Sequence, residues 1–257
     1  EEQIGDRLDL RKETIVTIDP ATARDFDDAI SLRRDRRGHW QLGVHIADVA
    51  HFVPVGSALD RSARERGTSV YLPRHVIPML PEVISNGLAS LQEGRVRFTK
   101  SVFIEFDPAG NVMGAEVANS VIQVSKRFAY EEVMPIVEDP QAQKGKVAAK
   151  IVQLLLRMHE LAMLLRKKRF AAGALQMGVP EVEIDFDDDG NVTGAHERHH
   201  DESHEIIEEF MLAANIAVAQ LLASRDIPFL RRAHGTPDEL RLKNFKDFCS
   251  GLGFELQ

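Results

Sequence analysis

TIDPATARDFDDAI, residues 17 to 30, carries four aspartates within ten positions and a single cation, Arg24, to offset them. The aspartates are Asp19, Asp25, Asp27 and Asp28. Asp19 ends an apolar strand and the others lie in the loop that leads to the next strand, so one turn can bring the carboxylates together. Like charges this close repel one another strongly unless a cation lies between them. Carboxylates without His or Cys nearby favour Mg²⁺ or Mn²⁺ over zinc.

Two interpretations of this stretch stay open from the pattern alone. The first is a solvated acidic turn, which is common in hairpins. The second is a metal site, and magnesium held by a few carboxylates keeps coordination positions for phosphate oxygens. The metal site would point to phosphoryl chemistry.

Strands dominate the first half of the chain. The predicted strands are residues 14–18, 29–32, 40–48 and 101–106, and a stretch near 112–123. In WQLGVHIAD, residues 40–48, apolar residues alternate with the others, which predicts one buried face. RRDRRGH and DPAGN supply the turns of two hairpins. The sheet is therefore expected to be largely antiparallel.

Helical spacing of apolar residues dominates the second half. It predicts helices over 147–169 and 203–224, with Ser203 as the N-cap of the second, and another helix after Pro237, at a position where a first helical turn tolerates proline. The chain shows no internal repeat or low-complexity tract. The expected fold is one α+β domain over residues 1–257, with a largely antiparallel sheet or barrel as its core and helices packed on it.

The composition is that of a soluble globular protein: 257 residues, of which 44% are hydrophobic and 28% charged. Cys249 is the single cysteine, so an internal disulfide is excluded and a reducing compartment, the cytoplasm, is expected. No N-terminal run resembles a signal peptide. The apolar run over 210–223 is too short to span a bilayer and is predicted to be a buried helix. No membrane partner is expected.

The net charge of −8 argues against broad, nonspecific adhesion to a phosphate backbone. Two basic clusters interrupt this acidic average. RRDRRGH, residues 33–39, is interpreted as a hairpin tip, and RKKR, residues 166–169, as a solvated helix end.

Three further motifs resemble metal sites. DFDDDGNVTG, residues 185–194, imitates the start of a calcium loop, but the twelfth position is His196 instead of glutamate, so a hairpin turn is predicted. The unevenly spaced histidines of HERHHDESH are interpreted as a solvated segment. These are His196, His199, His200 and His204. His45, Asp48 and His51 are interpreted as structural, with His45 on the sheet face opposite Trp40.

Four linked motifs together resemble the RNB catalytic domain of the ribonuclease II and ribonuclease R exoribonucleases. They are TIDPATARDFDDA at 17–29, VHIADVAHFV at 44–53, LDRSARERGTSVYLPRHVIPMLPEVISNGLASL at 59–91 and HEIIEEFMLAANIAVA at 204–219. The resemblance spans nearly the whole chain in order. It implies hydrolysis of single-stranded RNA from the 3′ end to nucleoside 5′-monophosphates, with Mg²⁺ as the usual cofactor and Mn²⁺ as a possible one.

The resemblance also implies roles for particular residues. Asp19, Asp25, Asp27 and Asp28 match the acidic quartet that holds metal against the scissile phosphate and positions a water. Two ions ~4 Å apart would need several carboxylates in one place.

Three RNA-binding residues are implied in the same way. Tyr71 matches an aromatic residue that stacks on a base near the 3′ end, a contact that tolerates any base. Tyr130 and Glu208 match the pair that reads ribose hydroxyls, since a carboxylate can accept the 2′-OH proton that DNA lacks. Glu209 is the rival for the role of Glu208. The plainer interpretations are a half-buried sheet tyrosine and a glutamate favoured by the helix dipole.

The chain departs from the family pattern in two respects. Gln176 lies where some members place a second aromatic residue. An arginine-rich SPIRRY-like segment and the cold-shock and S1 domains of the family are not in this sequence. The expectation is an incomplete RNB domain with weak or no activity by itself.

Two other functional classes were weighed against the nuclease. A haloacid-dehalogenase-like phosphatase also uses paired aspartates on magnesium, but its first aspartate directly follows an apolar strand, whereas Asp25 follows ATAR. A catalytically silent RNB-like module that binds RNA or acts as a scaffold would commonly lack an aspartate of the quartet. All four are present.

Overall fold

The computed structural model of the chain describes residues 4–72, 74–175, 179–180, 182–197 and 200–255. The chain forms two compact units, residues 1–221 and 222–257, and the boundary falls inside helix α5, Glu202–Ser224. The first unit holds every strand and all the predicted site residues. In the second unit, helix α6 spans Glu239–Gly251.

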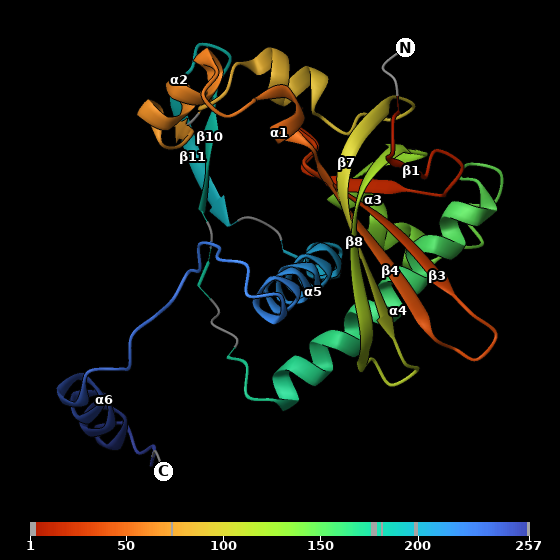
Figure 1. The fold of residues 1–257 in the computed structure, drawn as a ribbon. Helices are drawn as coiled ribbons and strands as arrows, with labels where there is room; N and C mark the ends of the chain where they lie inside the picture. The colour runs from red at the N-terminus through yellow and green to blue at the C-terminus, as the bar shows by residue number, and fades with distance from the viewer. Residues whose placement is uncertain (1–3, 73, 176–178, 181, 198–199, 256–257) are drawn as a thin grey trace. The chain divides into compact units, whose positions relative to one another are not determined.

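A seven-stranded sheet forms the centre of the first unit (Figure 1), in the order β1-β8-β7-β4-β3-β2-β9. Its strands are β1 (Leu8–Asp9), β2 (Val16–Asp19), β3 (Asp28–Arg34), β4 (Trp40–Ala47), β7 (Val96–Phe106), β8 (Val112–Gln123) and β9 (Lys126–Ala129). The pairs are antiparallel except β1 with β8 and β2 with β9, which are parallel. The predicted α+β fold with a largely antiparallel sheet is confirmed.

The first unit also contains helices and two small hairpins. The helices of the first unit are α1 (Val49–Phe52), α2 (Ala58–Arg66), the π-helix η1 (Val83–Leu88), α3 (Tyr130–Glu138), α4 (Ala149–Ala171) and α5. Two small hairpins complete it: β5 (Val70–Leu72) with β6 (His75–Ile77), and β10 (Val182–Phe186) with β11 (Val192–Glu197). The second of these confirms that DFDDDGNVTG is a hairpin turn, in which the Asp187 carboxylate accepts a hydrogen bond from the Asn191 N–H at 2.8 Å.

Each face of the sheet buries a hydrophobic core. Trp40, Leu42 and Val44 alternate along β4 and pack with the apolar faces of α3, α4 and α5. A smaller core on the other side includes Ile15 and Phe26. The alternation predicted for β4 is therefore confirmed, because one face of the strand packs on helices and the other carries His45.

Helix α5 is longer than the apolar run within it. At 23 residues and with a mean hydropathy of 1.6 over its most apolar window, it is long and apolar enough to cross a membrane by length and composition, so the length argument from the sequence was wrong. Its first half is nevertheless part of the main core, where Ile206 and Phe210 are fully buried. A core helix satisfies the same length and composition.

Two predicted helix starts shift by a few residues. Ser203 is not the N-cap of α5: it lies inside the helix, and the Asp201 carboxylate accepts its backbone N–H at 3.0 Å. Pro237 precedes α6 instead of lying in its first turn, because Asp238 is the N-cap and accepts the Arg241 N–H at 3.0 Å. Aspartate fills both positions as well as serine would.

His45 belongs to a buried chain of polar side chains that crosses the sheet. Its Nδ1 lies 2.6 Å from Ser101 Oγ and its Nε2 lies 2.9 Å from Ser31 Oγ. The neighbouring Gly43 leaves room for this chain, since a Cβ there would lie 2.4 Å from Ser31 Oγ. His45 is fully buried, and burial lowers its pKa to about 3. Its structural role, predicted from the sequence, is confirmed.

The buried imidazole predicts acid sensitivity. Below its ordinary pKa of 6.5, His45 binds a proton in the unfolded chain but stays neutral in the folded one, so stability falls as the pH drops from 6.5 toward 3. Between about pH 7 and 5, the wild type should lose ~2 kcal/mol more free energy of unfolding than His45→Gln. Urea denaturation at both pH values measures this difference. The contributions of the other titratable groups to the pH dependence are the same in both proteins and therefore cancel. Parallel pH profiles would contradict this assignment.

Candidate active site

The four aspartates lie at the neighbouring ends of two strands. Asp19 ends β2, Asp28 begins β3, and Asp25 and Asp27 lie in the loop between them. The two strands are antiparallel neighbours, with Val16 opposite Ile30, so the end of one lies beside the start of the other. Strand pairing therefore places the four aspartates at one end of the sheet.

The aspartate loop is held by the side chains of two residues that are distant in sequence, Arg127 and Ser90. Arg127 of β9 donates from Nη2 to the carbonyl oxygens of Pro20, at 2.9 Å, and Ala21, at 3.1 Å. Ser90 Oγ donates to the Arg24 carbonyl at 2.8 Å and accepts the Phe26 N–H at 3.1 Å. The loop is thus fixed to distant segments instead of being a freely solvated turn, which disfavours the alternative left open by the sequence.

Burial and mutual repulsion raise the pKa of three of the carboxyl groups. The pKa of Asp19 is raised to about 7, first by burial and then by the charge of Asp28, against a smaller opposing effect of Arg127. The pKa of Asp28 is raised to about 6 by burial and by Asp27. Burial and the charge of Asp25 also raise the pKa of Asp27. The carboxyl groups at this end of the sheet thus repel one another, and the charge of Arg127 offsets only part of this effect at Asp19.

The donor set fits a hard divalent cation. Asp19 is only 8% exposed, and its buried Oδ2 has no hydrogen-bond partner in the structure. An unpartnered buried carboxylate oxygen is costly unless a cation or another donor satisfies it. No three His, Cys, Asp or Glu side chains among the described residues lie close enough together to form a ready metal site. The carboxylates thus share one end of the sheet without converging on a single point.

A cavity of about 750 Å³ connects the aspartate loop to the β5–β6 hairpin. Asp25 and Asp27 line it on one side, and Tyr71 lines it on the other. The Tyr71 side chain is 71% exposed, so its ring is accessible instead of being a half-buried sheet residue. Arg74, which follows on the same hairpin, also lines the cavity and lies over the Phe186 ring at 5.6 Å.

Tyr130 lies next to the aspartates through strand pairing. In the parallel β2–β9 ladder Asp19 pairs with Ala129, and Tyr130 is the next residue. The Tyr130 ring stacks on His204, with centroids 3.9 Å apart and an interplanar angle of 11°. His204 and Glu208 are one helical turn apart on α5, so their side chains share one face of the helix. Tyr130 thus contacts the residue that lies one helical turn before Glu208.

The structure separates the two candidate glutamates by burial. Glu209 is 4% exposed and both hydrogen bonds to its Oε1 come from Arg169, whereas the Glu208 side chain is 48% exposed. Glu208 is thus the glutamate that a ligand can reach, and Glu209 is a buried structural partner.

Two sequence interpretations need correction here. RKKR, residues 166–169, is not simply a solvated helix end, because Arg166 and Arg169 form ion pairs with α5. His204 is not part of a merely solvated segment, because it is stacked on Tyr130 and lies 3.2 Å from the Asp201 carboxylate. The ion pairs with α5 and the stack on Tyr130 join residues some 39 to 74 positions apart, so local spacing gave no signal for them. His199 and Gln176 lie outside the described residues.

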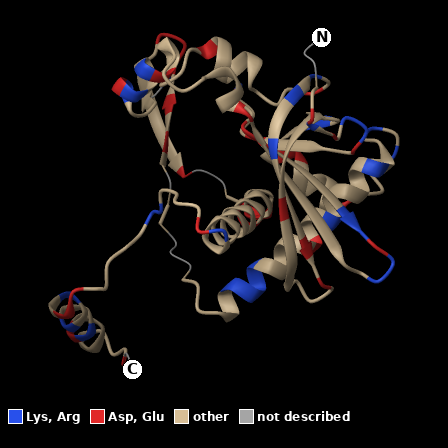
Figure 2. Cartoon of the chain, viewed as in Figure 1, with Lys and Arg blue, Asp and Glu red and all other residues tan. Residues whose placement is uncertain are grey.

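Basic residues lie beside this acidic site, where Arg24 and Arg74 line the cavity, and also in other parts of the chain. Figure 2 shows them at the turn between β3 and β4 and along α4. The turn confirms RRDRRGH as a hairpin tip, where Arg34 pairs with Glu160 at 2.8 Å.

Comparisons with known proteins identify the fold and the family. The RNB domain family matches residues 7–256. Ribonuclease R of Thermotoga maritima is 44% identical over 96% of this chain, which covers 35% of that protein. The structure of Mycoplasma genitalium RNase R in complex with ribose-methylated single-stranded RNA has a TM-score of 0.90 at 30% identity, over 98% of this chain and 39% of that one.

A more distant structure shares the fold alone. Yeast Ssd1, described as a pseudonuclease, is 20% identical with a TM-score of 0.75, over 99% of this chain and 31% of that chain. The present chain spans about a third of the length of the curated relatives that it matches. The match over residues 7–256, together with the full-length structural similarity, shows that the chain belongs to the RNB domain family.

Proposed function

We propose that this chain is the catalytic part of a 3′-to-5′ exoribonuclease that hydrolyses single-stranded RNA to nucleoside 5′-monophosphates with Mg²⁺, or with Mn²⁺ in its place. The observation that carries the proposal is the aspartate group at the ends of β2 and β3, of which Asp25 and Asp27 line a cavity shared with the exposed Tyr71 ring. The RNA named in the ribonuclease R structure supports the substrate class.

The proposed roles follow from position and chemistry. Asp19, Asp25, Asp27 and Asp28 would hold magnesium, which supplies Lewis-acid stabilisation of the phosphate and a more acidic attacking water. Burial first, and then the charge of a neighbouring aspartate, raises the pKa of Asp19, Asp27 and Asp28, and a bound cation would favour the charged carboxylates there. Tyr71 would stack on a base without selecting its identity.

Tyr130 and Glu208 would contact the ribose. The Glu208 carboxylate can accept a hydrogen bond from a 2′-hydroxyl, which a deoxyribose lacks. The half-exposed Glu208 carboxylate and the stack of Tyr130 on His204 support these roles, and Tyr130 follows Ala129, the β9 residue that pairs with Asp19.

The direct test uses a 5′-labelled single-stranded RNA with magnesium, in this chain and in a longer form extended to the length of its ribonuclease R relatives. We expect products that shorten progressively from the 3′ end in the longer form. Internal cuts would contradict the proposal. Binding without digestion in the longer form would favour the catalytically silent module instead.

Magnesium binding can be tested without activity. At about ten times its dissociation constant, Mg²⁺ should stabilise the wild-type chain by ~1.4 kcal/mol, which raises the melting temperature by ~3–6 °C. Asp19→Asn should remove this response. It should also raise the stability of the metal-free chain by on the order of 2 kcal/mol near pH 8, where the folded chain otherwise holds a buried charge.

Potassium chloride at matched ionic strength is the control for that experiment. An equal rise in melting temperature in wild type and Asp19→Asn would show that Asp19 is not a metal ligand. A variant that is less stable than wild type without magnesium would show that the charged carboxylate supports the fold.

A further inference from the structure

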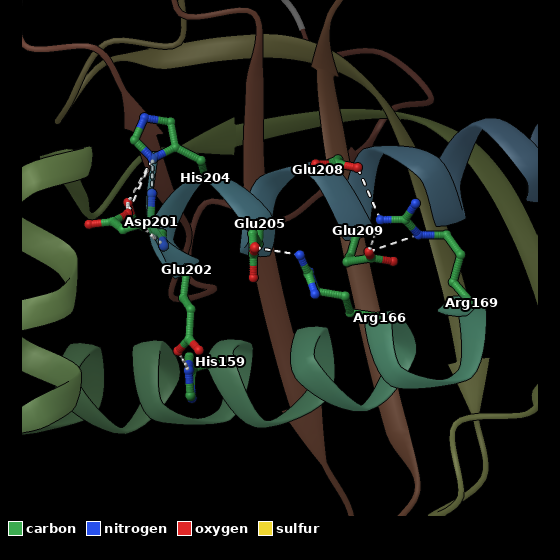
Figure 3. A network of polar contacts seen from close by, with 10 residues as sticks. His159, Arg166, Arg169, Asp201, Glu202, His204, Glu205, Glu208 and Glu209 are labelled. Atoms are coloured by element: carbon green, nitrogen blue, oxygen red, sulfur yellow. Dashed lines mark hydrogen bonds and ion pairs between the residues drawn. The ribbon is translucent and has the colours of Figure 1, made fainter. Parts of the chain in front are cut away.

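Helices α4 and α5 are joined by a ladder of ion pairs (Figure 3). His159 lies 2.5 Å from Glu202, and Arg166 lies 2.6 Å from Glu205. Arg169, near the end of α4, forms the last rung. The first two rungs each join one basic residue to one carboxylate.

The Arg169 rung differs because one guanidinium binds two carboxylates. Its Nε and Nη2 donate to Glu209 Oε1 at 2.9 and 2.5 Å, and Nη2 also donates to Glu208 Oε1 at 3.0 Å. The two glutamates are adjacent in sequence, yet one is buried and the other is half exposed. Arg169 thus connects the interior of the helix pair to its surface.

The buried glutamate fixes the position of Arg169, and Arg169 in turn restrains the exposed glutamate. Glu209, at 4% exposed, is fixed in the core and holds the guanidinium by two hydrogen bonds. Charge-assisted bonds of this kind are strong and geometrically specific. The guanidinium, fixed at that end, restricts the Glu208 carboxylate at the other. A half-exposed glutamate without such a partner would sample many rotamers.

The contact with Arg169 leaves one Glu208 oxygen available. Among the described residues, Glu208 accepts a hydrogen bond at Oε1 alone, so Oε2 has no protein partner there. That oxygen belongs to the side chain one turn from His204, on which Tyr130 stacks.

We propose that Arg169 is a positioning residue that holds Glu208 for the ribose 2′-hydroxyl and thereby sets the preference for RNA over DNA. This inference rests on the proposed function, because it assumes that Glu208 reads the ribose. Arg169 acts through Glu208 and not by touching the ligand. Lysine could not replace it, since an ammonium is a compact point charge without the guanidinium fork that bridges two carboxylates.

The test measures the affinities of this chain for a labelled oligoadenylate RNA and for its all-2′-deoxy counterpart, by fluorescence anisotropy without divalent cation so that neither is digested. Arg169→Gln should lower the ratio of RNA to DNA affinity by about fivefold, the scale set by immobilising one flexible side chain. Arg169→Lys should lower it by a similar factor. Arg166→Gln is the matched control, because it breaks the neighbouring rung to Glu205 and should leave the ratio unchanged.

A double variant separates positioning from direct contact. In a Glu208→Ala background, which lacks the acceptor oxygen, the ratio should already be reduced, and adding Arg169→Gln should change it no further. If Arg169→Gln weakens RNA and DNA equally, the arginine is a phosphate contact and the positioning role is overturned. If Arg166→Gln lowers the ratio as much, the effect is general loosening of the helix pair, and the role is again overturned.

The same measurements distinguish this inference from the proposed function. A wild-type chain without any preference for RNA would remove the ribose-reading role of Glu208, and the positioning role with it. A wild type that prefers RNA and keeps that preference in Arg169→Gln would overturn the positioning role alone.

Discussion

Asp27→Asn should abolish most RNA digestion while leaving RNA binding nearly intact. The substitution keeps the size of the side chain but removes one negative charge and weakens a magnesium ligand. In a longer form of the chain, extended to the length of its relatives, single-turnover digestion should fall by ~10³ or more, because metal-ion stabilisation accounts for several kcal/mol of the barrier. RNA affinity should stay the same or increase slightly, since stacking and phosphate contacts lie elsewhere.

Filter binding and single-turnover digestion of one labelled RNA measure both halves of this prediction. Asp188→Asn is the matched control, because it makes the same chemical change in an exposed turn between β10 and β11. Near-normal digestion by Asp27→Asn would show that Asp27 is not a metal ligand. Loss of binding together with digestion would show that the aspartate group supports the fold instead of the reaction.

Phe210→Ala should strongly lower the free energy of unfolding. Phe210 is fully buried in the main core, on the helix that carries Glu208 and Glu209. Removing a buried phenyl ring leaves a cavity that the surrounding side chains fill only in part, so the free energy of unfolding should fall by ~3–5 kcal/mol. Urea denaturation of the wild type and the variant measures this loss.

Ile216→Ala, on the same helix, is the matched control for that measurement. The Ile216 side chain is 56% exposed, so its truncation should change stability by ~0.5 kcal/mol or less. If the two variants lost similar stability, the buried face of α5 would not be the one described above.

The elements that could be predicted from sequence are those with a local signature. The alternation from Trp40 to Ile46 marks β4, and the apolar spacing of residues 147–169 and 203–224 marks α4 and α5, because a buried face imposes its period on the sequence. The aspartate group could also be predicted from sequence, because its four residues lie within ten consecutive positions.

Contacts between distant segments could not be predicted in this way. The parallel pairing of β2 with β9 joins residues about 110 positions apart, and the sequence of neither strand indicates which strand it pairs with. The same holds for Arg169 with Glu209 and for Tyr130 with His204. RKKR looked like a solvated helix end because charge alone does not distinguish an arginine in water from one bound to a buried carboxylate.

The pairing of Asp19 with Ala129 has a consequence for how the protein assembles. Strand β2 is complete within the first 20 residues, but its outer neighbour β9 follows only after β3, β4, β7 and β8. Closing so long a loop costs entropy before its contacts are gained, so this edge of the sheet is expected to form late in folding. Helix α5 is synthesised later still. In the order of synthesis the aspartates precede Tyr130 and Glu208 by more than 100 positions, so the groups proposed to form one site are made far apart along the chain.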